Sequence, residues 1–518
     1  MNEISLSPVW VADLGDGKYR NPILHADYSD LDIIRVGDSF YMTASSFVST
    51  PGLPILESKD LVNWTIIGYA VDRLPSGYDE SVRHAQGIWA PSIRYHDGMF
   101  WIFVSTPDEG VFMTQAKDAS GPWSELHLVK EVKGWIDPCP MWDEDGQAYL
   151  IHAYAYSRCG FNSKLNLCKM KSDGTALLDD GVVVFDGTND HPTIEGPKLY
   201  KRNGYYYIFA PAGGVATGWQ TVLRSRNIFG PFEDRIVMHQ GDTQINGPHQ
   251  GGYVELDSGE SWFAHFQECG AYGRIVHLQP MTWQNDWPMI GADTNGDGIG
   301  EPVMSHNKPN VGPHSWPITV PDTSDHFEKS SLGLQWQWQG NRKAEWYSLD
   351  ANPGNLRLYA NTHHANLFEA PNILCQKFPA PVFTATCKLN LGPRERGLFQ
   401  SGMTVFGHEF AYMAVEHNGF NKRMVVVEGN RNEDEKLTSS FELENSLSSV
   451  YIQVHVAAGA LCTFHFSLDG IEYQQIGGDP FIAKPGGWVG AKIGLFCSPM
   501  GYESENDFVD FEWISIKE

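Results

Sequence analysis

A short pattern that recurs five times in the first 300 residues constrains this chain more than any other feature. In each copy an apolar strand, a tight turn containing Gly and a strongly aromatic strand follow one another, and such turns favour hairpins. The copies stand roughly fifty to sixty residues apart, which is the length of a four-stranded propeller blade. A β-sandwich would also give many hairpins, but not this period. The sequence therefore predicts an all-β protein whose residues 1–302 form a five-bladed β-propeller. The turn dipeptides are Gly37-Asp38, Asp97-Gly98, Asp145-Gly146, Asn203-Gly204 and Ser258-Gly259.

The character of the sequence changes after residue 300. Prolines at every fourth position from 309 to 321 punctuate a segment without apolar alternation, which indicates a linker over residues 303–324. Short strands separated by irregular turns follow, without a further propeller repeat. We therefore expect residues 325–518 to form a jelly-roll-like β-sandwich. An aromatic content of 13%, with 52 Gly and 30 Pro, agrees with an all-β chain.

The charge balance of the chain restricts its partners. There are 37 Lys and Arg against 63 Asp and Glu, so the formal net charge is -26. Such a surface repels phosphate backbones, which excludes nucleic acid as a partner and is compatible with a neutral oligosaccharide substrate. No stretch approaches the roughly eighteen apolar residues of a membrane span, so we expect no membrane partner. A homo-oligomer is left open.

The cysteines and the first residues of the chain bear on its compartment. The N-terminus has neither the basic region nor the apolar region of a secretory signal. The 8 cysteines are scattered, without CxxC pairs or Cys/His metal spacing, and we interpret them as free and mostly buried thiols. These features predict a cytoplasmic protein.

The residue before the innermost strand of each propeller blade lies near one mouth of the central channel. In the five copies this place is taken by three carboxylates, one indole and one imidazole. A single Asp or Glu there is usually a solvated turn residue or a cap, but three like charges around one axis are costly unless they are used or paired. We therefore expect them to form a functional site. The five residues are Asp30, Trp89, Asp137, Glu195 and His249.

Three axial carboxylates are the equipment of glycosidic bond cleavage. A protonated carboxyl gives its proton to the leaving oxygen, while an ionised carboxylate activates water or attacks the sugar. A third carboxylate beside the acid raises the pKa of that acid and keeps it protonated near neutrality. Trp89 offers a face for a sugar ring, with core packing as the alternative. We predict a glycoside hydrolase with Asp30, Asp137 and Glu195 as its catalytic residues.

The segments around these residues have a recognisable form. They read NPILHADYSDLDIIRVGDSFYMTASSF, GIWAPSIRY, WIDPCPMWDEDG, IEGPKLYKRNGYYY and GPHQGGYVELDSGESWFAHFQECGAYGRIVHLQP. Together they resemble glycoside hydrolase family 43, in particular its β-xylosidase and α-L-arabinofuranosidase branch with a C-terminal sandwich. SLGLQWQWQG and NDFVDFEWISI are similar to segments of those sandwiches, so the resemblance covers nearly the whole chain.

The resemblance implies a role for each axial carboxylate. Asp30 falls on the general base of the family, but the prolines that flank that residue are absent here, so Asp27 and Asp32 remain competitors. Asp137 falls on the residue that tunes the acid, and Glu195 falls on the general acid.

Further residues match positions that bind substrate or metal in the family. Arg274 falls on an arginine that contacts the sugar and a carboxylate, and Phe47 and Trp89 fall on aromatic walls of the sugar pocket. His249 falls on a histidine that holds a cation on the axis, usually calcium, either directly or through water. A neutral histidine hydrogen-bonded within the channel is the alternative.

A second calcium site in the sandwich is also considered, with Asp325 and Asp510 as candidates. The segment Asp293–Gly298 resembles the first half of a calcium loop, but Met304 stands at position twelve, which favours a plain polar turn. No organic cofactor is expected.

The sequence thus predicts an inverting exo-glycosidase that releases xylose, arabinose or both from short oligosaccharides. Inversion requires a water between Asp30 and Glu195, with their carboxyl groups roughly 6.5–9.5 Å apart. The alternatives are a hydrolase of the same fold acting on another linkage, such as arabinan, and a non-catalytic propeller that serves as a binding platform. The sandwich could bind sugar, close the pocket with a loop or form an oligomer contact.

Overall fold

The computed structural model describes residues 9–391, 397–418, 421–501 and 507–518. The first eight residues, on which the expected absence of a secretory signal rests, lie outside this range. Within it, strands dominate; the helical segments are α1 (Tyr156–Cys159) and the short 3₁₀ turns η1 (Ser76–Tyr78), η2 (Gly270–Tyr272), η3 (Ala344–Trp346) and η4 (Leu367–Glu369). No helix in the described ranges is long and apolar enough to cross a membrane.

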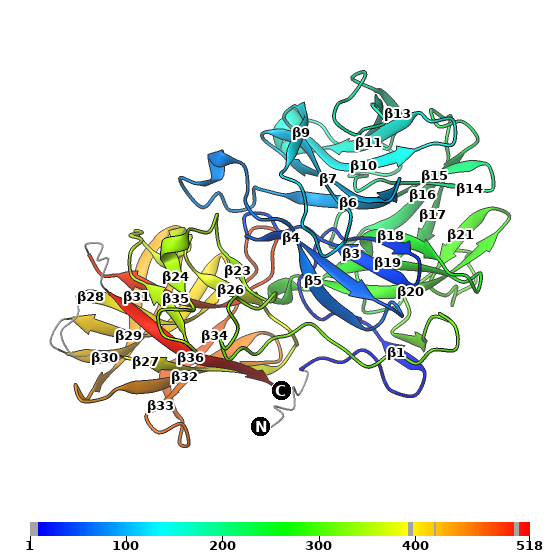
Figure 1. Cartoon of the computed structure of the whole chain (residues 1–518). Coiled ribbons are helices and arrows are strands. Elements are labelled where there is room, and N and C mark those ends of the chain that lie inside the picture. The colour runs from blue at the N-terminus through cyan, green and yellow to red at the C-terminus, as the bar shows by residue number, and fades with distance from the viewer. Residues whose placement is uncertain (1–8, 392–396, 419–420, 502–506) are drawn as a thin grey trace.

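Five four-stranded antiparallel sheets form the propeller, each from consecutive strands (Figure 1). The predicted propeller is therefore confirmed, and all five predicted turns join the two innermost strands of a blade. Blade 1 contains β2 (Asp32–Val36), β3 (Ser39–Thr43), β4 (Gly52–Ser58) and β5 (Trp64–Val71). Blade 2 contains β6 (Trp89–His96), β7 (Met99–Thr106), β8 (Gly110–Ala116) and β9 (His127–Glu131). Blade 3 contains β10 (Trp135–Trp142), β11 (Ala148–Tyr154), β12 (Lys164–Met170) and β13 (Val182–Asp186). Blade 4 contains β14 (Lys198–Arg202), β15 (Tyr205–Ala212), β16 (Trp219–Ser225) and β17 (Glu233–Met238). Blade 5 contains β18 (His249–Glu255), β19 (Ser261–Glu268), β20 (Arg274–Gln284) and β21 (Trp287–Ile290).

Apolar side chains fill the space between neighbouring blades. A separate buried cluster lies between each pair of adjacent blades, including one between blade 5 and blade 1. Most inner strands are therefore buried on both faces, as expected for a covered sheet, whereas outer strands such as β9 and β13 are largely exposed. The inner strands β2, β6, β10, β14 and β18 surround the axis, and β18 contacts β2 to complete the ring.

The chain before blade 1 closes the ring. β1 (Lys18–Arg20) pairs with β22 (Ser305–Asn307), which lies within the predicted linker. Asn21 then bonds to blade 5: its amide nitrogen donates to the carbonyls of Leu278 and Val303, both at 2.8 Å, and its amide oxygen accepts from Leu278 N–H at 2.9 Å. Because every blade is a continuous stretch of chain, the seam between blades 5 and 1 relies on such contacts and on the packing of the two blades.

A residue with positive φ lies within two residues of the start of each inner strand. These residues have φ of 53°, 41°, 58°, 59° and 28° in blades 1 to 5. In blades 2, 3 and 5 the strand pairing shifts register at this point, which is a β-bulge, and bulges re-aim side chains next to functional sites. Trp89, Glu195 and His249 stand one residue before the positive-φ position, so the five predicted axial residues are not strictly equivalent. The positive-φ residues are Asp30, Ala90, Asp137, Gly196 and Gln250.

The second domain is a sandwich of two seven-stranded sheets, as predicted (Figure 1). Its core lies between the sheets, where the inward side chains of both are buried. One sheet has the order β23 (Gln337–Trp338), β26 (Leu374–Lys377), β35 (Lys492–Pro499), β28 (Leu398–Phe406), β29 (Glu409–Asn418), β30 (Lys422–Asn430) and β31 (Glu433–Leu443). The other has the order β24 (Tyr347–Ser348), β25 (Leu356–Tyr359), β36 (Phe508–Lys517), β27 (Phe383–Asn390), β32 (Ser449–Ala457), β33 (Leu461–Ser467) and β34 (Gln474–Ile482).

The sandwich is bonded directly to the propeller. Thr50 in blade 1 forms an isolated β-bridge with Trp338, and Ala491 N–H donates to the carbonyl of Ala271 in blade 5 at 2.7 Å. The two domains therefore meet beside blades 1 and 5, near the mouth that carries the positive-φ residues. The eight cysteines are thiols that take part in no disulfide, as predicted.

Candidate active site

Three carboxylates from three different blades meet at one mouth of the propeller. The negative charges of Glu195 and Asp30 lie close enough to Asp137 to raise its pKa. Gly196 N–H donates to Asp137 Oδ2 at 2.7 Å. This last bond joins the start of blade 4 to blade 3. The structure therefore brings together Asp30, Asp137 and Glu195, the three residues that the repeat indicated.

Asp30 is held by a guanidinium and two hydroxyls. Arg274 Nη1 lies 2.7 Å from Asp30 Oδ1, while Ser29 Oγ and Ser45 Oγ donate to Oδ2 at 2.6 and 2.7 Å. Arg274 also donates to Ser29 Oγ at 2.7 Å. These partners hold the carboxylate in one orientation, and charge-assisted bonds of this kind are the strong ones. Arg274 is thus placed on the carboxylate, as expected for the residue it matches.

The two competitors for the role of Asp30 are engaged elsewhere. Asp27 accepts from the N–H groups of Arg274 at 2.8 Å and Gly490 at 3.0 Å, so it ties blade 5 to the sandwich. Asp32 is fully buried and pairs with Arg94 Nη1 at 2.6 Å. Asp30, by contrast, lies close enough to Asp137 for its charge to act on that carboxyl, which leaves Asp30 as the candidate base of blade 1.

Asp137 is nearly completely buried, with 4% of its surface exposed. Burial raises the pKa of Asp137 to about 8, and the charges of Glu195 and Asp30 act in the same direction. The hydrogen bond from Gly196 N–H and the charge of Lys198 oppose this shift. The set of three carboxyl groups (Asp30, Asp137 and Glu195) therefore retains a proton near neutral pH.

Glu195 is the carboxyl group of the three that faces solvent, with 32% of its side chain exposed. His249 Nε2 lies 3.1 Å from Glu195 Oε1, and the imidazole itself is completely buried. His249 thus holds Glu195 from the buried side, while 32% of the Glu195 side chain remains open to solvent. A proton carried by Glu195 can therefore reach a bound substrate.

Aromatic side chains lie beside the carboxylates. The rings of Phe47 and Trp89 are 6.4 Å apart between centroids, and the guanidinium of Arg158 from α1 lies 5.3 Å from the Trp89 ring. Trp89 is only partly buried, so one part of its ring system remains open to a ligand. Phe47 is buried at 4% exposure and supports Trp89 rather than offering a wide face.

Trp488 is a residue of this site that the sequence reasoning missed. It lies on a sandwich loop, is 52% exposed, and its ring centroid is 5.6 Å from the Arg274 guanidinium, which holds Asp30. The Gly490 N–H bond to Asp27 anchors this loop to the propeller. The only signal in the sequence is a tryptophan that directly follows Gly486-Gly487, in a segment whose glycines favour a loop. Of the roles left open for the sandwich, the geometry favours a loop that reaches the pocket.

The surroundings of His249 give little support to a metal site built by protein ligands. His249 Nδ1 has no hydrogen-bond partner in the described part of the chain, so one ring nitrogen is free for water or an ion. Calcium, however, takes six to eight oxygen ligands, and no cluster of three or more His, Cys, Asp or Glu side chains among the described residues is placed to hold a metal. Calcium at His249 stays a prediction, and no step below uses it.

The candidates for a second calcium site also serve other partners. Asp325 accepts from Trp336 Nε1 at 2.8 Å, and Asp510 pairs with Arg357 at 2.8 Å. In the segment Asp293–Gly298, the Asp293 carboxylate accepts from the N–H groups of Gly296 and Gly298. The last pattern is that of a polar turn, which is the favoured interpretation of this segment.

The arrangement is suited to acid–base chemistry on a neutral ligand. It contains a carboxylate paired with a guanidinium, a solvent-facing carboxyl group next to a buried protonated one, and aromatic faces at the rim. In hydrolases, two carboxyl groups whose surroundings favour opposite protonation states serve as the acid and the base. Two opposed carboxyl groups at a pocket that admits water are the machinery of glycoside hydrolysis.

Comparison with known proteins agrees with this chemistry. Residues 19–288 match the model of "Glycosyl hydrolases family 43", and residues 324–517 match "Beta xylosidase C-terminal Concanavalin A-like domain". The chain is 42% identical to a putative beta-xylosidase of Xylanibacter ruminicola, over 94% of this chain and 87% of that protein. It is 28% identical to a non-reducing end alpha-L-arabinofuranosidase of Bacteroides ovatus, over 98% of this chain and 97% of that one.

A solved structure shows the same two-domain architecture. The crystal structure of a family 43 protein of Bacillus licheniformis superposes with a TM-score of 0.83, at 25% identity, and the match covers 96% of this chain and 99% of that one. The family model spans more than half of the chain, and the Xylanibacter relative aligns over nearly all of it. This chain belongs to glycoside hydrolase family 43.

Proposed function

We propose that this glycoside hydrolase is an inverting exo-glycosidase that releases xylose, arabinose or both from short xylo- or arabino-oligosaccharides. The observation that carries the proposal is the contrast between Glu195 and Asp30. Glu195 faces solvent beside a buried protonated carboxyl, whereas Asp30 is paired with Arg274. The names of the relatives, beta-xylosidase and non-reducing end alpha-L-arabinofuranosidase, support the pentose substrates and the exo mode.

In the proposed mechanism Glu195 is the general acid. It donates a proton to the glycosidic oxygen as the bond to the departing sugar breaks, which avoids the release of an alkoxide. Asp137 keeps a proton within the carboxylate group near neutral pH, and His249 holds one oxygen of Glu195 so that the other faces the substrate.

Asp30 is the general base of the proposal. It takes a proton from a water that attacks the anomeric carbon from the side opposite to the leaving group. Arg274, Ser29 and Ser45 occupy both oxygens of Asp30 and fix its direction. A separation of roughly 6.5–9.5 Å between the carboxyl groups of Asp30 and Glu195 leaves room for this water and remains a prediction.

The test compares two substrates in Glu195→Ala. General-acid help matters most for a poor leaving group, so we expect xylobiose hydrolysis to fall roughly 10²–10⁴-fold. Hydrolysis of 4-nitrophenyl β-xyloside, whose leaving group is a weak base, should fall much less. Glu144→Gln, which alters an exposed carboxyl elsewhere, is the matched control and should behave as the wild type. Equal losses on both substrates, or full activity on xylobiose, would overturn the role of Glu195.

Two further measurements address the remaining parts of the proposal. Proton NMR of the first-formed sugar should show the anomer opposite to that of the substrate; retention would exclude the water-mediated role of Asp30. Parallel rates on 4-nitrophenyl β-xyloside and α-L-arabinofuranoside define the pentose preference. A cytoplasmic location stays a prediction, which fractionation of the source cells tests.

A further inference from the structure

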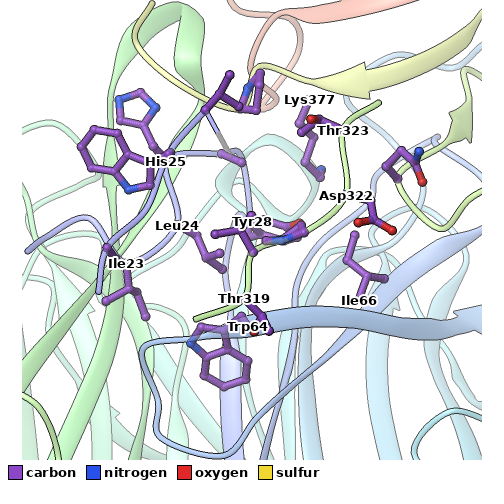
Figure 2. A pocket seen from close by; sticks show the side chains of 18 of the residues that line it. Ile23, Leu24, His25, Tyr28, Trp64, Ile66, Thr319, Asp322, Thr323 and Lys377 are labelled. Atoms are coloured by element: carbon purple, nitrogen blue, oxygen red, sulfur yellow. The ribbon is translucent and has the colours of Figure 1, made fainter. Parts of the chain in front are cut away.

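The propeller axis has a second mouth, opposite the catalytic carboxylates, and this mouth is also hollow. The catalytic carboxylates lie where the inner strands begin, whereas the second mouth lies where the same strands end, and all five inner strands line it. It holds about 480 Å³, within the roughly 300–1,000 Å³ of common small-molecule sites. The space between the two domains, beside Tyr28, Trp64 and Lys377 (Figure 2), holds only about 70 Å³. We call the hollow at the second mouth the far pocket.

Buried side chains from three blades fill the axis between the two mouths. Asp32 and Lys198 are fully buried, and Asp32 Oδ2 lies 4.0 Å from Lys198 Nζ and 2.6 Å from Arg94 Nη1. A strand rises about 3.3 Å per residue, so Trp142 at the far pocket lies roughly 15 Å along β10 from Asp137. A ligand in the far pocket therefore does not contact the catalytic carboxylates.

The backbone of the inner strands supplies hydrogen-bonding groups to the far pocket. Each inner strand is the first strand of its sheet, so one of its edges has no neighbour in the sheet and faces the channel. Bonded and non-bonded pairs alternate along an antiparallel ladder, and the residue just before the pair that closes each inner hairpin turns its N–H and C=O to this free edge. In the described part of the chain, these five N–H groups donate to no other residue. The five residues, all lining the far pocket, are Arg35, Tyr95, Trp142, Lys201 and Glu255.

Hydrogen bonds deeper in the channel confirm the direction of this free edge. Ile93 N–H donates to Asp32 Oδ2 at 3.0 Å, and Tyr253 N–H donates to the Tyr200 hydroxyl at 3.1 Å, in both cases to a side chain of another blade. Alternate residues of a strand face the same edge, so the N–H groups two residues further on point the same way. Side chains occupy these backbone groups inside the channel, whereas at the far pocket they are open to a ligand.

Aromatic side chains stand among these backbone groups. Tyr95 is 46% exposed, and its one ring neighbour in the described part of the chain is Phe100, in a T-shaped contact at 4.9 Å between centroids. At least one face of the Tyr95 ring is thus open to a ligand. Trp142 is held in place, because its Nε1 donates to the carbonyl of Ser172 at 2.7 Å and its ring stacks on His96.

Each acidic or basic side chain of the far pocket is paired with a residue that does not line it. An ionic ligand therefore finds no unpaired charge there, whereas a neutral polar ligand leaves the pairs intact. The pairs are Arg35 with Asp257, Arg94 with Asp32, Lys201 with Asp143, and Glu255 with Arg202.

From this geometry we propose that the far pocket is a second, non-catalytic binding site for a neutral oligosaccharide. One sugar ring stacks on Tyr95, and the hydroxyl groups, which both donate and accept, bond to the N–H and C=O groups of the free strand edges. An apolar ligand would leave these backbone groups without partners. The choice of a xylo-oligosaccharide as the ligand rests on the proposed function, but the class of ligand does not.

Titration calorimetry with xylotriose counts the sites, using the full-length Glu195→Ala variant so that hydrolysis is slow. We expect two sites, one at each mouth. Adding Tyr95→Ala should weaken one of them roughly three- to tenfold, because an aromatic contact is lost. Phe441→Ala, which removes an exposed aromatic ring from β31 of the sandwich, is the matched control and should leave both sites unchanged. A single site, or two sites that Tyr95→Ala leaves unchanged, would overturn the inference.

Activity separates this inference from the proposed function. Tyr95→Ala in the otherwise unaltered enzyme should hydrolyse 4-nitrophenyl β-xyloside at the wild-type rate. Met141→Trp, which narrows the far pocket and keeps Tyr95, should also lose the second site and retain activity. Loss of activity together with binding in both variants would refute a separate site. A wild type that hydrolyses neither the xyloside nor xylotriose, but binds xylotriose in a Tyr95-dependent way, would overturn the proposed function and support the far pocket.

Discussion

Asp27, Asp30 and Asp32 at the start of blade 1 have different partners. Substitutions of Asp30 and Asp32 should therefore differ in their effect on activity. Asp30→Asn removes the proposed base, so we expect the turnover number to fall roughly 10²–10⁴-fold; it also leaves the buried guanidinium of Arg274 without its charged partner, so the melting temperature should fall as well. Asp32→Asn leaves the guanidinium of Arg94 without its buried partner, which should cost about 3–5 kcal/mol of stability. Steady-state rates and thermal unfolding of the two variants check this. A folded, fully active Asp30→Asn would contradict the assignment within blade 1.

The raised pKa of Asp137 has a consequence for stability. The folded protein binds this proton more tightly than the unfolded chain, so the stability from Asp137 is present below about pH 4 and lost as pH rises through about 8. Asp137→Asn removes the titration. We expect the melting temperature of the variant, relative to wild type, to increase from about pH 5 to about pH 8.

Calorimetry across this pH range measures the difference. Asp145→Asn, in an exposed turn at the other end of blade 3, is the control and should give a difference that does not vary with pH. The wild-type activity should decline as pH rises through about 8, as the carboxylate group loses its proton. A difference between Asp137→Asn and wild type that is constant with pH would contradict the raised pKa.

At the level of single residues, the repeat predicted which carboxylates meet at the axis but not their surroundings. Asp30, Asp137 and Glu195 could be predicted because a repeat converts positions in the chain into positions around an axis. The bond from Ser45 to Asp30 could not, because it depends on how the loop after β3 folds back. The one-residue offset of Glu195 could not either, because it follows from a local backbone conformation with positive φ.

At the level of elements, the sandwich loop around Trp488 completes the site of the other domain. Trp488→Ala should raise KM about three- to tenfold, since an aromatic contact contributes roughly 0.5–1.5 kcal/mol. Stability should hardly change, because the ring is half exposed. Kinetics on xylobiose test this, with Ile471→Ala as a control for an exposed apolar residue on another sandwich loop. An unchanged KM would place Trp488 outside the substrate path.

The strands of the propeller were easier to predict than the pieces that join them. Hairpin turns such as Asp97-Gly98 carry a local signal, since both residues adopt the positive φ that favours Asp, Asn and Gly. Strand β22 carries none: it lies in a proline-punctuated segment and exists because β1, nearly 300 residues earlier in the chain, pairs with it. Pairing at such separation is decided by the whole fold.

For the molecule as a whole, the net charge of -26 should leave catalysis untouched if the substrate is neutral. Raising the salt concentration from about 50 to 500 mM screens charges beyond a few ångströms, so we expect kcat/KM for xylobiose to change less than twofold. An oligosaccharide carrying a uronic acid serves as the contrast, since repulsion should slow it most at low salt. A strong salt dependence for xylobiose would argue against a neutral substrate.

The architecture of the whole chain followed from the repeat and from the change of pattern near residue 300. The docking of the two domains did not, because contacts such as the one between Thr50 and Trp338 join segments with no shared sequence signal. The site needs this docking, since Trp488 and the anchor of its loop on Asp27 belong to different domains.

The seam at Asn21 makes the propeller a ring with a single place of closure. Four of the five blade junctions are spanned by the chain itself, but the fifth is held by side-chain and backbone bonds such as those of Asn21 with Leu278. Circular permutants that join blade 5 to blade 1 covalently and open the ring between two other blades would move this weak point. An opening between blades 3 and 4 would then separate Asp137 from Glu195, whereas the seam between blades 5 and 1 leaves intact the junction that the bond from Gly196 N–H to Asp137 spans.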